Sequence, residues 1–324
     1  ETVPIVAYHD LKPIIQEVLK GDYQALLPEP PVEWGVTSGT RGPAKLIPIT
    51  PTEFRQRAVL GARMMANYLA RTGNRQIFDG ACLNLSFPSR LGTIRMGNRQ
   101  VPYGYISGIY AKHSAESFQV DIVPSAEEVN RLGAGVSREA WQRRFNYTWK
   151  RLKGKNVTMA IGPATTLYDF GRFVRRRCGA YPWEIWDVQA LFCTSVPHIQ
   201  TSYKGPLKRL YGQQVDIVEL YGATEGFYAL QMDEKPFITP FFDAYFFEVV
   251  VNREAKMLHE LEEGEWGRLV VSSCLFPRYD IGDLIQCHGG TYYRVFGRSR
   301  PWTILAHVLT QSLRSLILTF VQLF

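Results

Sequence analysis

The sequence predicts an α/β protein whose core is a parallel or mixed β-sheet covered by helices, followed by an antiparallel β region. Between residues 157 and 220, short apolar and β-branched runs alternate with stretches in which apolar residues recur at helical spacing. Such alternation is typical of doubly wound folds. From Tyr245 to Ser272, β-branched and aromatic runs are separated only by charged turns, which indicates antiparallel strands.

Composition agrees with a folded globular protein. The 324 residues are 46% hydrophobic and 21% charged, close to the averages for such proteins. The net charge of +7 suits an anionic ligand, but it is spread along the chain. The densest basic cluster, Arg172 to Arg177, lies in a helical pattern, and we expect it to be a solvated face. No basic run is interleaved with stacking aromatics, so we expect no nucleic-acid partner.

The five cysteines form no CxxC pair, which argues against a zinc site and against a secreted disulfide framework. A cytoplasmic location fits this pattern. No basic and apolar leader is visible in the first ten residues.

The N-terminal elements can be placed by their end signals. Residues 10–20 form an amphipathic pattern, with Asp10 as the expected N-cap and Gly21 as the expected end of the helix. Val32–Val36 reads as a strand and Thr52–Thr72 as a long helix. The predicted order is strand, Gly-rich loop, helix.

The central and C-terminal elements follow from the same periodicities. We expect helices near 137–153, 165–178 and 202–211, and strands at Ala81–Phe87, Val157–Ile161, Ala190–Thr194, Val215–Leu220, Tyr245–Val251 and Arg268–Ser272. The first 300 residues would form the catalytic core.

The tail, residues 301–324, is expected to be a hinge remnant or a terminal helix. Its stretch Ile304–Phe324 is apolar but is interrupted by polar residues, Arg314 among them. A membrane span needs about 20 almost uninterrupted apolar residues, and a central arginine is costly there. We therefore expect an amphipathic helix and no membrane partner.

The first motif able to carry chemistry is the loop Thr37–Lys45 (TSGTRGPAK). Glycines let the backbone approach a phosphate, hydroxyls donate hydrogen bonds, and the lysine supplies positive charge. It is not a Walker A loop, because GxxxxGK[ST] is absent. Taken alone, such a loop is more often an ordinary turn than a phosphate site.

Two further motifs place carboxylates after strands. In Val215–Gly226 (VDIVELYGATEG), Glu225 follows an apolar strand and a tight turn, where it could hold a Mg²⁺ ion. In Arg278–Asp283 (RYDIGD), Asp283 follows a glycine and could accept hydrogen bonds from both hydroxyls of a ribose. A polar strand end and a plain β-turn are the alternatives. Three motifs in this order and at these separations favour one nucleotide site.

The set TSGTxGxxK, YGATEG, YxxGD and Gly297-Arg298 resembles the core motifs of the adenylate-forming superfamily, which includes acyl-CoA synthetases, adenylation domains and luciferases. More specifically, the chain is similar to the auxin-responsive Gretchen Hagen family of acyl-acid amido synthetases. That similarity rests on Val3-Pro4-Ile5-Val6, Asp10-Leu11-Lys12-Pro13, Lys45-Leu46-Ile47-Pro48 and Ile106-Ser107-Gly108.

The resemblance implies the fold of the large N-terminal domain of this superfamily, with ATP and Mg²⁺ as cofactors. It implies a reaction in which a carboxylate and ATP give acyl-AMP, which an amine such as an amino acid then attacks. Lys45, Thr224 and Glu225 would be catalytic, Glu225 also binding the metal. The nucleotide would contact Thr37, Ser38, Gly39, Thr40, Gly42, Tyr221, Gly222, Ala223, Asp283 and Arg298.

The small-molecule acid would contact Tyr103, Tyr105 and Ile106, although the same side chains suit a core equally well. The resemblance leaves two alternatives: an acyl-CoA ligase of the phenylacetate type, with coenzyme A as the acceptor, and a non-catalytic nucleotide-binding remnant. The match fades after Arg298, so we expect the swivelling C-terminal domain of the family to be missing. The family's Gly-rich turn is replaced here by Cys193-Thr194-Ser195.

Overall fold

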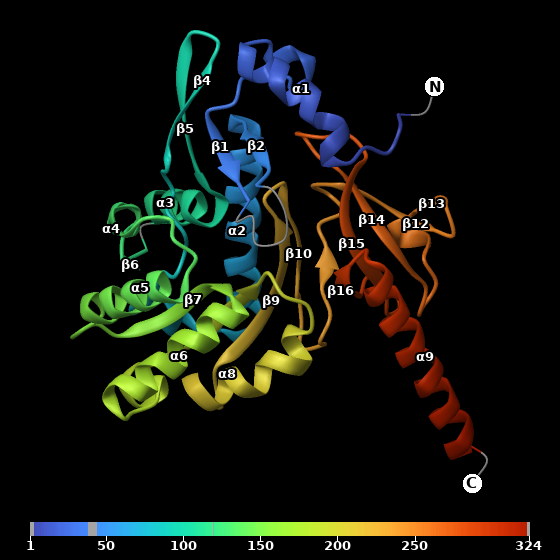
Figure 1. Ribbon diagram of the computed structural model, residues 1–324. Helices are drawn as coiled ribbons and strands as arrows, with labels where there is room; N and C mark the ends of the chain where they lie inside the picture. The colour runs from blue at the N-terminus through green and yellow to red at the C-terminus, as the bar shows by residue number, and fades with distance from the viewer. Residues whose placement is uncertain (1–2, 38–43, 119, 323–324) are drawn as a thin grey trace.

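The computed structural model describes residues 3–37, 44–118 and 120–322. Its strands form three sheets, with strand orders β2-β1-β5-β4, β11-β10-β9-β8-β7-β3-β6 and β13-β12-β14-β15-β16. The four-stranded sheet stands above the seven-stranded sheet in Figure 1, and the five-stranded sheet lies to its right. The α/β class with a separate antiparallel region is therefore confirmed.

Helix α1 (Tyr8–Lys20) ends at Gly21 as predicted, with this glycine in the left-handed conformation. The predicted N-cap is wrong, because Ala7 holds that position. Asp10 lies three residues further on, and its carboxylate accepts a hydrogen bond from the Ala7 N–H at 2.8 Å. The acidic side chain thus caps the helix from within its first turn.

The four-stranded sheet corrects the predicted order of strand, loop and helix. Its strands are β1 (Glu33–Val36), β2 (Leu46–Ile49), β4 (Gly92–Met96) and β5 (Arg99–Tyr105). β2 follows the Gly-rich loop and pairs antiparallel with β1, so the loop lies in a hairpin. β2 is an edge strand, which is where the ladder tolerates Pro48. Helix α2 (Pro51–Thr72) begins only after β2 and is capped by the Thr50 side chain.

The seven-stranded sheet is mixed. The five strands from β9 to β6 in the strand order are parallel, and β10 and β11 add antiparallel pairs at the other edge. The strands are β3 (Ala81–Leu83), β6 (Ile122–Val123), β7 (Val157–Pro163), β8 (Ala190–Thr194), β9 (Asp216–Ala223), β10 (Gly226–Leu230) and β11 (Thr239–Pro240). β3 is shorter than the predicted Ala81–Phe87, because the Asn84 side chain accepts the Ser86 N–H at 3.0 Å and turns the chain.

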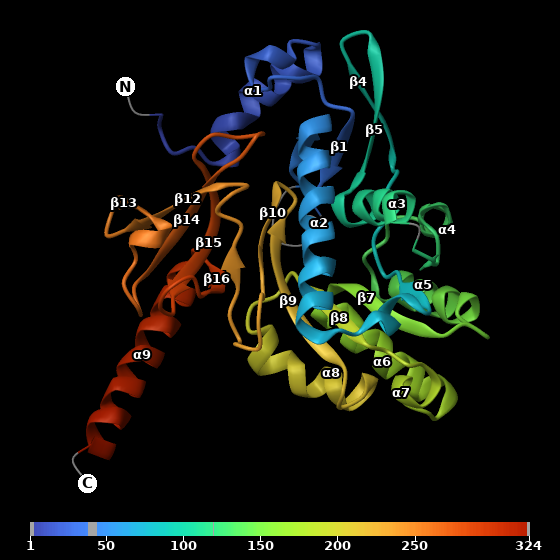
Figure 2. The same ribbon diagram turned by 180° about the vertical axis from the view of Figure 1, so that it is seen from behind.

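Helices cover both faces of this sheet. α6 (Ala164–Cys178) and α8 (Lys204–Tyr211) lie on the face toward the viewer in Figure 1, and α2 crosses the opposite face in Figure 2. The other helices are α3 (Ile106–Phe118), α4 (Ala126–Leu132), α5 (Arg138–Arg151) and α7 (Pro182–Ile185), with short turns at Tyr23–Ala25, Arg75–Phe78, Ile199–Tyr203 and Leu258–Glu260. The basic cluster Arg172 to Arg177 on α6 has its arginines exposed, as predicted.

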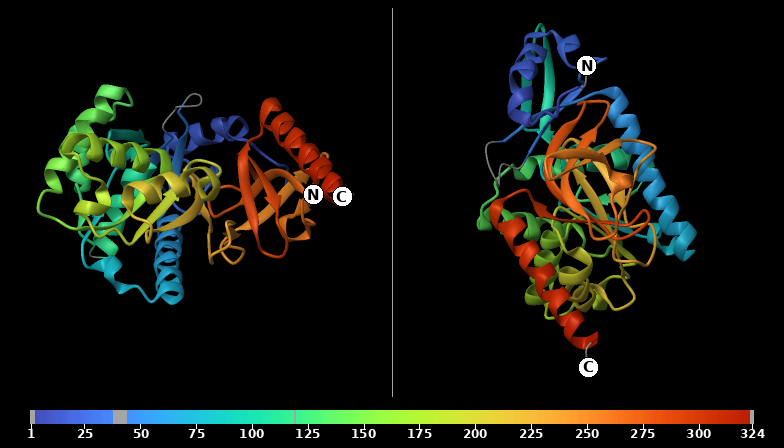
Figure 3. Two further views of the ribbon diagram at one scale, coloured as in Figure 1. Left: turned by 90° about the horizontal axis from the view of Figure 1, so that it is seen from below. Right: turned by 90° about the vertical axis from the view of Figure 1, so that its right-hand side faces the viewer.

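The five-stranded sheet is antiparallel throughout, which confirms the predicted β region. It consists of β12 (Phe246–Val251), β13 (Glu254–Met257), β14 (Trp266–Ser272), β15 (Tyr279–Cys287) and β16 (Tyr293–Arg298). Seen from below, this sheet and the green helices α5 and α6 occupy opposite ends of the molecule (Figure 3).

Helix α9 (Pro301–Gln322) follows β16 and extends away from the five-stranded sheet (Figure 1). Its first turns expose Trp302 and Leu305, while His307 stacks on Phe296 of the sheet. Within the described residues, no helix combines the length and the apolar character needed to cross a membrane.

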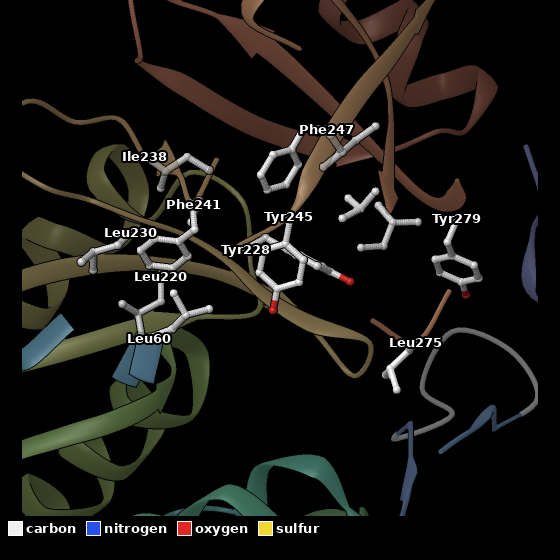
Figure 4. Close-up of a cluster of buried hydrophobic side chains, with 14 of the residues drawn as sticks. Leu60, Leu220, Tyr228, Leu230, Ile238, Phe241, Tyr245, Phe247, Leu275 and Tyr279 are labelled. Carbon is white, nitrogen blue, oxygen red and sulfur yellow. The ribbon is translucent and has the colours of Figure 1, made fainter. Parts of the chain in front are cut away.

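A single buried cluster joins the sheets at their common border. It includes Leu60 of α2, Leu220 of β9, Tyr228 of β10 and Phe247 of β12, which converge in Figure 4. A second cluster fills the space between the seven-stranded sheet and α5, α6 and α8. Because the first cluster ties together elements that carry all three motifs, the motifs are brought to one region.

Candidate active site

The acidic motif occupies the tip of a tight hairpin between β9 and β10. Ala223 pairs with Gly226, so Thr224 and Glu225 are the two residues of the turn. At Gly222 a Cβ atom would lie 2.8 Å from the Gly226 carbonyl oxygen. Only glycine allows this approach, and the hairpin therefore fixes where the Glu225 carboxylate can point.

Glu225 meets the lysine that ends the Gly-rich loop. The Tyr279 hydroxyl donates to Glu225 Oε1 at 2.8 Å and accepts from Lys45 Nζ, also at 2.8 Å. Lys45 Nζ lies 3.5 Å from the same carboxylate oxygen. Burial raises the pKa of Tyr279, and the Glu225 charge raises it further, so the hydroxyl keeps its proton. Residues from three separate sheets thus form one polar cluster.

The base of the Gly-rich loop is closed by two contacts between its ends. The Thr37 N–H donates to the Lys45 carbonyl at 3.1 Å, and the Lys45 N–H donates to Thr37 Oγ1 at 2.9 Å. The Tyr8 hydroxyl accepts the Leu46 N–H at 2.8 Å, and the Lys45 ammonium lies 5.3 Å from the Tyr8 ring centroid. These contacts hold Lys45 at the mouth of the loop. The other predicted phosphate contacts, Ser38, Gly39, Thr40 and Gly42, lie outside the described residues.

The predicted ribose carboxylate lies beside this cluster. Asp283 accepts a hydrogen bond from the Tyr221 hydroxyl at 2.8 Å and pairs with Arg298 at 2.9 Å. Burial raises the pKa of Asp283, while Arg298 and the Tyr221 hydroxyl act to lower it. Gly282 has a φ of 77°, a left-handed conformation that suits glycine. Each carboxylate oxygen retains a second lone pair for a diol.

The three residues predicted to contact the acid lie along β5 and the start of α3. Ile106 lies near the acidic motif, because its Cδ1 and the Thr224 methyl both come within 3.4 Å of where a Cβ of Gly35 would stand. Tyr105 packs on the Phe87 ring at 4.8 Å. Tyr103 contacts Gly92 across the β4–β5 hairpin. The structure thus brings Ile106 to the site and gives both tyrosines packing partners in the sheet.

The Ile106-Ser107-Gly108 match has a structural reason. A Cβ at Gly108 would lie 2.0 Å from the Phe87 carbonyl oxygen. Ser107 Oγ accepts the Phe87 N–H at 3.3 Å. The motif therefore docks the first turn of α3 on the segment that follows β3.

Sequence reasoning missed two buried charged residues near the motifs. Arg57 of α2 donates to the Ala223 and Thr224 carbonyls. Glu219 of β9 is 9% exposed, and burial raises its pKa to about 7 against the opposing effect of Arg294. A signal existed for Arg57, because it falls on the buried stripe of α2 with Glu53, Leu60, Met64 and Tyr68. Glu219 stands inside an apolar run, where a carboxylate is unexpected.

The donor set fits a Mg²⁺ ion bound together with nucleotide phosphates. Mg²⁺ usually takes one or two carboxylates and completes its shell with water and phosphate oxygens. Glu225 supplies one carboxylate, and the Thr224 hydroxyl is its neighbour in the turn. Among the described residues there is no cluster of three or more His, Cys, Asp or Glu side chains able to hold a metal alone.

Comparison with solved structures identifies the fold. The fold is similar to that of the GH3.15 acyl acid amido synthetase in complex with 2,4-DB, with a TM-score of 0.71 and 17% identity over 92% of this chain and 61% of that one. It is also similar to an open conformation of 2-hydroxyisobutyryl-CoA ligase, with a TM-score of 0.62 and 19% identity over 91% and 60% of the two chains. A long-chain-fatty-acid-CoA ligase from Archaeoglobus fulgidus matches at a TM-score of 0.51 and 11% identity, over 86% and 53%. The fold is that of the adenylate-forming ligases.

A family model matches the N-terminal part of the chain. Residues 1–132 match the model of the GH3 family N-terminal domain, which confirms the predicted resemblance to the Gretchen Hagen family. The search of curated proteins found no match. The chain spans 61% of the length of the acyl acid amido synthetase to which its fold is similar.

Proposed function

We propose that this chain activates a carboxylic acid with ATP as an acyl-adenylate, in the manner of an acyl-acid amido synthetase. The observation that carries the proposal is the meeting of Lys45, Glu225 and Tyr279 in one hydrogen-bonded cluster, although they are far apart in sequence. Asp283 lies close enough to this cluster for the Glu225 charge to act on its pKa. The residues that we propose for phosphate, metal and ribose contacts therefore lie near one another.

In the proposed reaction an oxygen of the acid attacks the α-phosphorus of ATP. A new P–O bond forms, the bond to the β-phosphate oxygen breaks, and pyrophosphate leaves with the electron pair. Lys45 would neutralise phosphate charge, Asp283 would hold the ribose, and Tyr221 to Thr224 would line the nucleotide. Mg²⁺ held by Glu225 and phosphate oxygens would supply further neutralisation. Positioning and charge dominate the rate of such steps.

In the second half-reaction we propose that an amine, such as that of an amino acid, attacks the acyl carbon and releases AMP. The match of residues 1–132 to the GH3 family domain supports an amine over coenzyme A. The similarity to a CoA ligase keeps a thiol as the alternative acceptor. Products formed from each acceptor, identified by mass spectrometry, distinguish an amide from a thioester.

The first half-reaction is tested by ATP–pyrophosphate exchange across a panel of aromatic and aliphatic acids. We expect acid-dependent exchange in the wild type and its loss in Glu225→Ala. Glu254→Ala, on the β12–β13 hairpin of the five-stranded sheet, is the matched control and should exchange like the wild type. ATP binding without exchange for any acid would refute the proposal and leave a nucleotide-binding relative.

A further inference from the structure

A buried ion pair on α2 touches the backbone of the acidic motif. Arg57 is 8% exposed and Glu53 is 2% exposed. Arg57 Nη2 donates to the Thr224 carbonyl at 2.7 Å, and Nη1 donates to the Ala223 carbonyl at 3.4 Å. These are the two residues directly before Glu225. A planar guanidinium with two donors can therefore fix the orientation of this backbone.

The guanidinium is itself held on its other side. Its Nε–H donates to Glu53 Oε1. The Tyr110 hydroxyl of α3 lies 2.9 and 3.0 Å from the two oxygens of the same carboxylate, and the Arg57 guanidinium lies 4.3 Å from the Tyr110 ring centroid. Tyr110, Glu53 and Arg57 thus form a relay from α3, which begins at Ile106, to the tip of the β9–β10 hairpin.

Fold stability alone is a poor explanation for this relay. Removing two charges from water costs several kcal/mol, and well-packed apolar residues are often as stabilising. Other contacts already hold the hairpin: the Phe227 N–H donates to the Tyr245 hydroxyl at 3.2 Å, and Gly222 packs against Gly226. What Arg57 adds is a fixed direction for the carbonyls of Ala223 and Thr224.

We propose that Arg57 is a positioning residue that sets, through the Ala223 and Thr224 carbonyls, the direction in which Glu225 meets the metal-bound phosphates. The inference rests on the proposed function for its catalytic consequence. The mechanical consequence is a stiff hairpin tip, which we expect in the free protein as well as in the presence of nucleotide. The two consequences are measured separately.

The catalytic arm compares Arg57→Lys with Arg63→Lys by ATP–pyrophosphate exchange. Lysine keeps the charge at position 57 but lacks the fork that spans two carbonyls. Arg63 is the matched control, since it lies on the same helix as Arg57 but pairs with Asp243 and not with the acidic motif. For Arg57→Lys we expect kcat to fall about 10- to 100-fold and the Mg²⁺ concentration for half-maximal exchange to rise, with KM for the acid unchanged. Arg63→Lys should match the wild type.

The mechanical arm measures amide hydrogen exchange of the peptide covering residues 221–230 in the free protein. Arg57→Lys should accelerate it about 10-fold, while Arg63→Lys should not. Tyr110→Phe, a milder change that keeps the ring, should accelerate it in the same direction by less. If the wild-type protein shows no pyrophosphate exchange, the proposed function is refuted. The hydrogen exchange of the 221–230 peptide still tests whether Arg57 positions the hairpin tip. Unchanged deuterium uptake in both Arg57→Lys and Tyr110→Phe overturns the inference, whatever the activity.

Discussion

Glu219 makes the stability of the fold depend on pH in a direction that can be worked out in advance. Its carboxyl is 9% exposed on β9. Burial raises its pKa from 4.5 to about 7, with Arg294 and the Gln200 backbone acting in the opposite direction. A raised folded-state pKa means that the folded protein binds this proton more tightly than the unfolded chain. The contribution to stability is full below about pH 4.5 and is lost as the pH rises through about 7.

The magnitude follows from the size of the shift. At about 1.4 kcal/mol per unit, the rise from 4.5 to about 7 corresponds to about 3 kcal/mol. Glu219→Gln keeps the shape of the protonated side chain and removes its ionisation. We expect the substitution to leave the free energy of unfolding nearly unchanged at about pH 4.5 and to raise it by up to about 3 kcal/mol at about pH 8.

Urea denaturation followed by tryptophan fluorescence at several pH values measures this difference. Glu248→Gln is the control, because Glu248 is equally buried but forms two contacts with Arg278, at 2.9 and 2.7 Å. That substitution should destabilise the protein at about pH 8, since the partly exposed Arg278 loses its charged partner. If Glu219→Gln lowers the free energy of unfolding at about pH 8, the reasoning about burial is wrong. The same holds if the substitution changes this free energy equally at about pH 4.5 and at about pH 8.

Three further substitutions probe the site and its supports. Asp283→Ala should weaken ATP binding, measured by calorimetry, by about 10-fold or more, because it removes the proposed ribose acceptor and leaves Arg298 without its partner. Tyr279→Phe should lower the rate of pyrophosphate exchange, since Lys45 and Glu225 lose the hydroxyl between them; an unchanged rate would count against a role for this bridge. Gly108→Ala should lower the melting temperature, because its Cβ would overlap the Phe87 carbonyl oxygen; full stability would show that α3 can shift without cost.

Elements with local signals were predicted well from the sequence. α2 differs by one residue at its start from the predicted Thr52–Thr72, and the strand Ala190–Thr194 matches at both ends. α6 was expected near 165–178 and spans Ala164–Cys178. In each case the apolar period and the flanking turn residues agree, so neighbouring residues determine the element.

Elements defined by distant partners were predicted less well. The β1–β2 hairpin was missed, because Leu46–Ile49 is four residues long and its strand character comes from pairing with β1. The strand at Ala81 ends early because of a side-chain turn at Asn84. Three motifs were recognised by residue type, but the Tyr279 bridge and the Arg57 contacts link positions 54 to 234 residues apart. Spacing along the chain carries no information on such contacts.

The arrangement of the candidate site explains why the motifs lie so far apart in sequence. Lys45 precedes an edge strand of the four-stranded sheet, Glu225 caps a hairpin of the seven-stranded sheet, and Tyr279 begins a strand of the five-stranded sheet. A polyphosphate with its Mg²⁺ ion would take a cationic group and a carboxylate, and in the proposed site separate segments of the chain supply them. The buried cluster of Figure 4 holds these sheet ends together, so a cavity made there should weaken nucleotide binding as well as the fold.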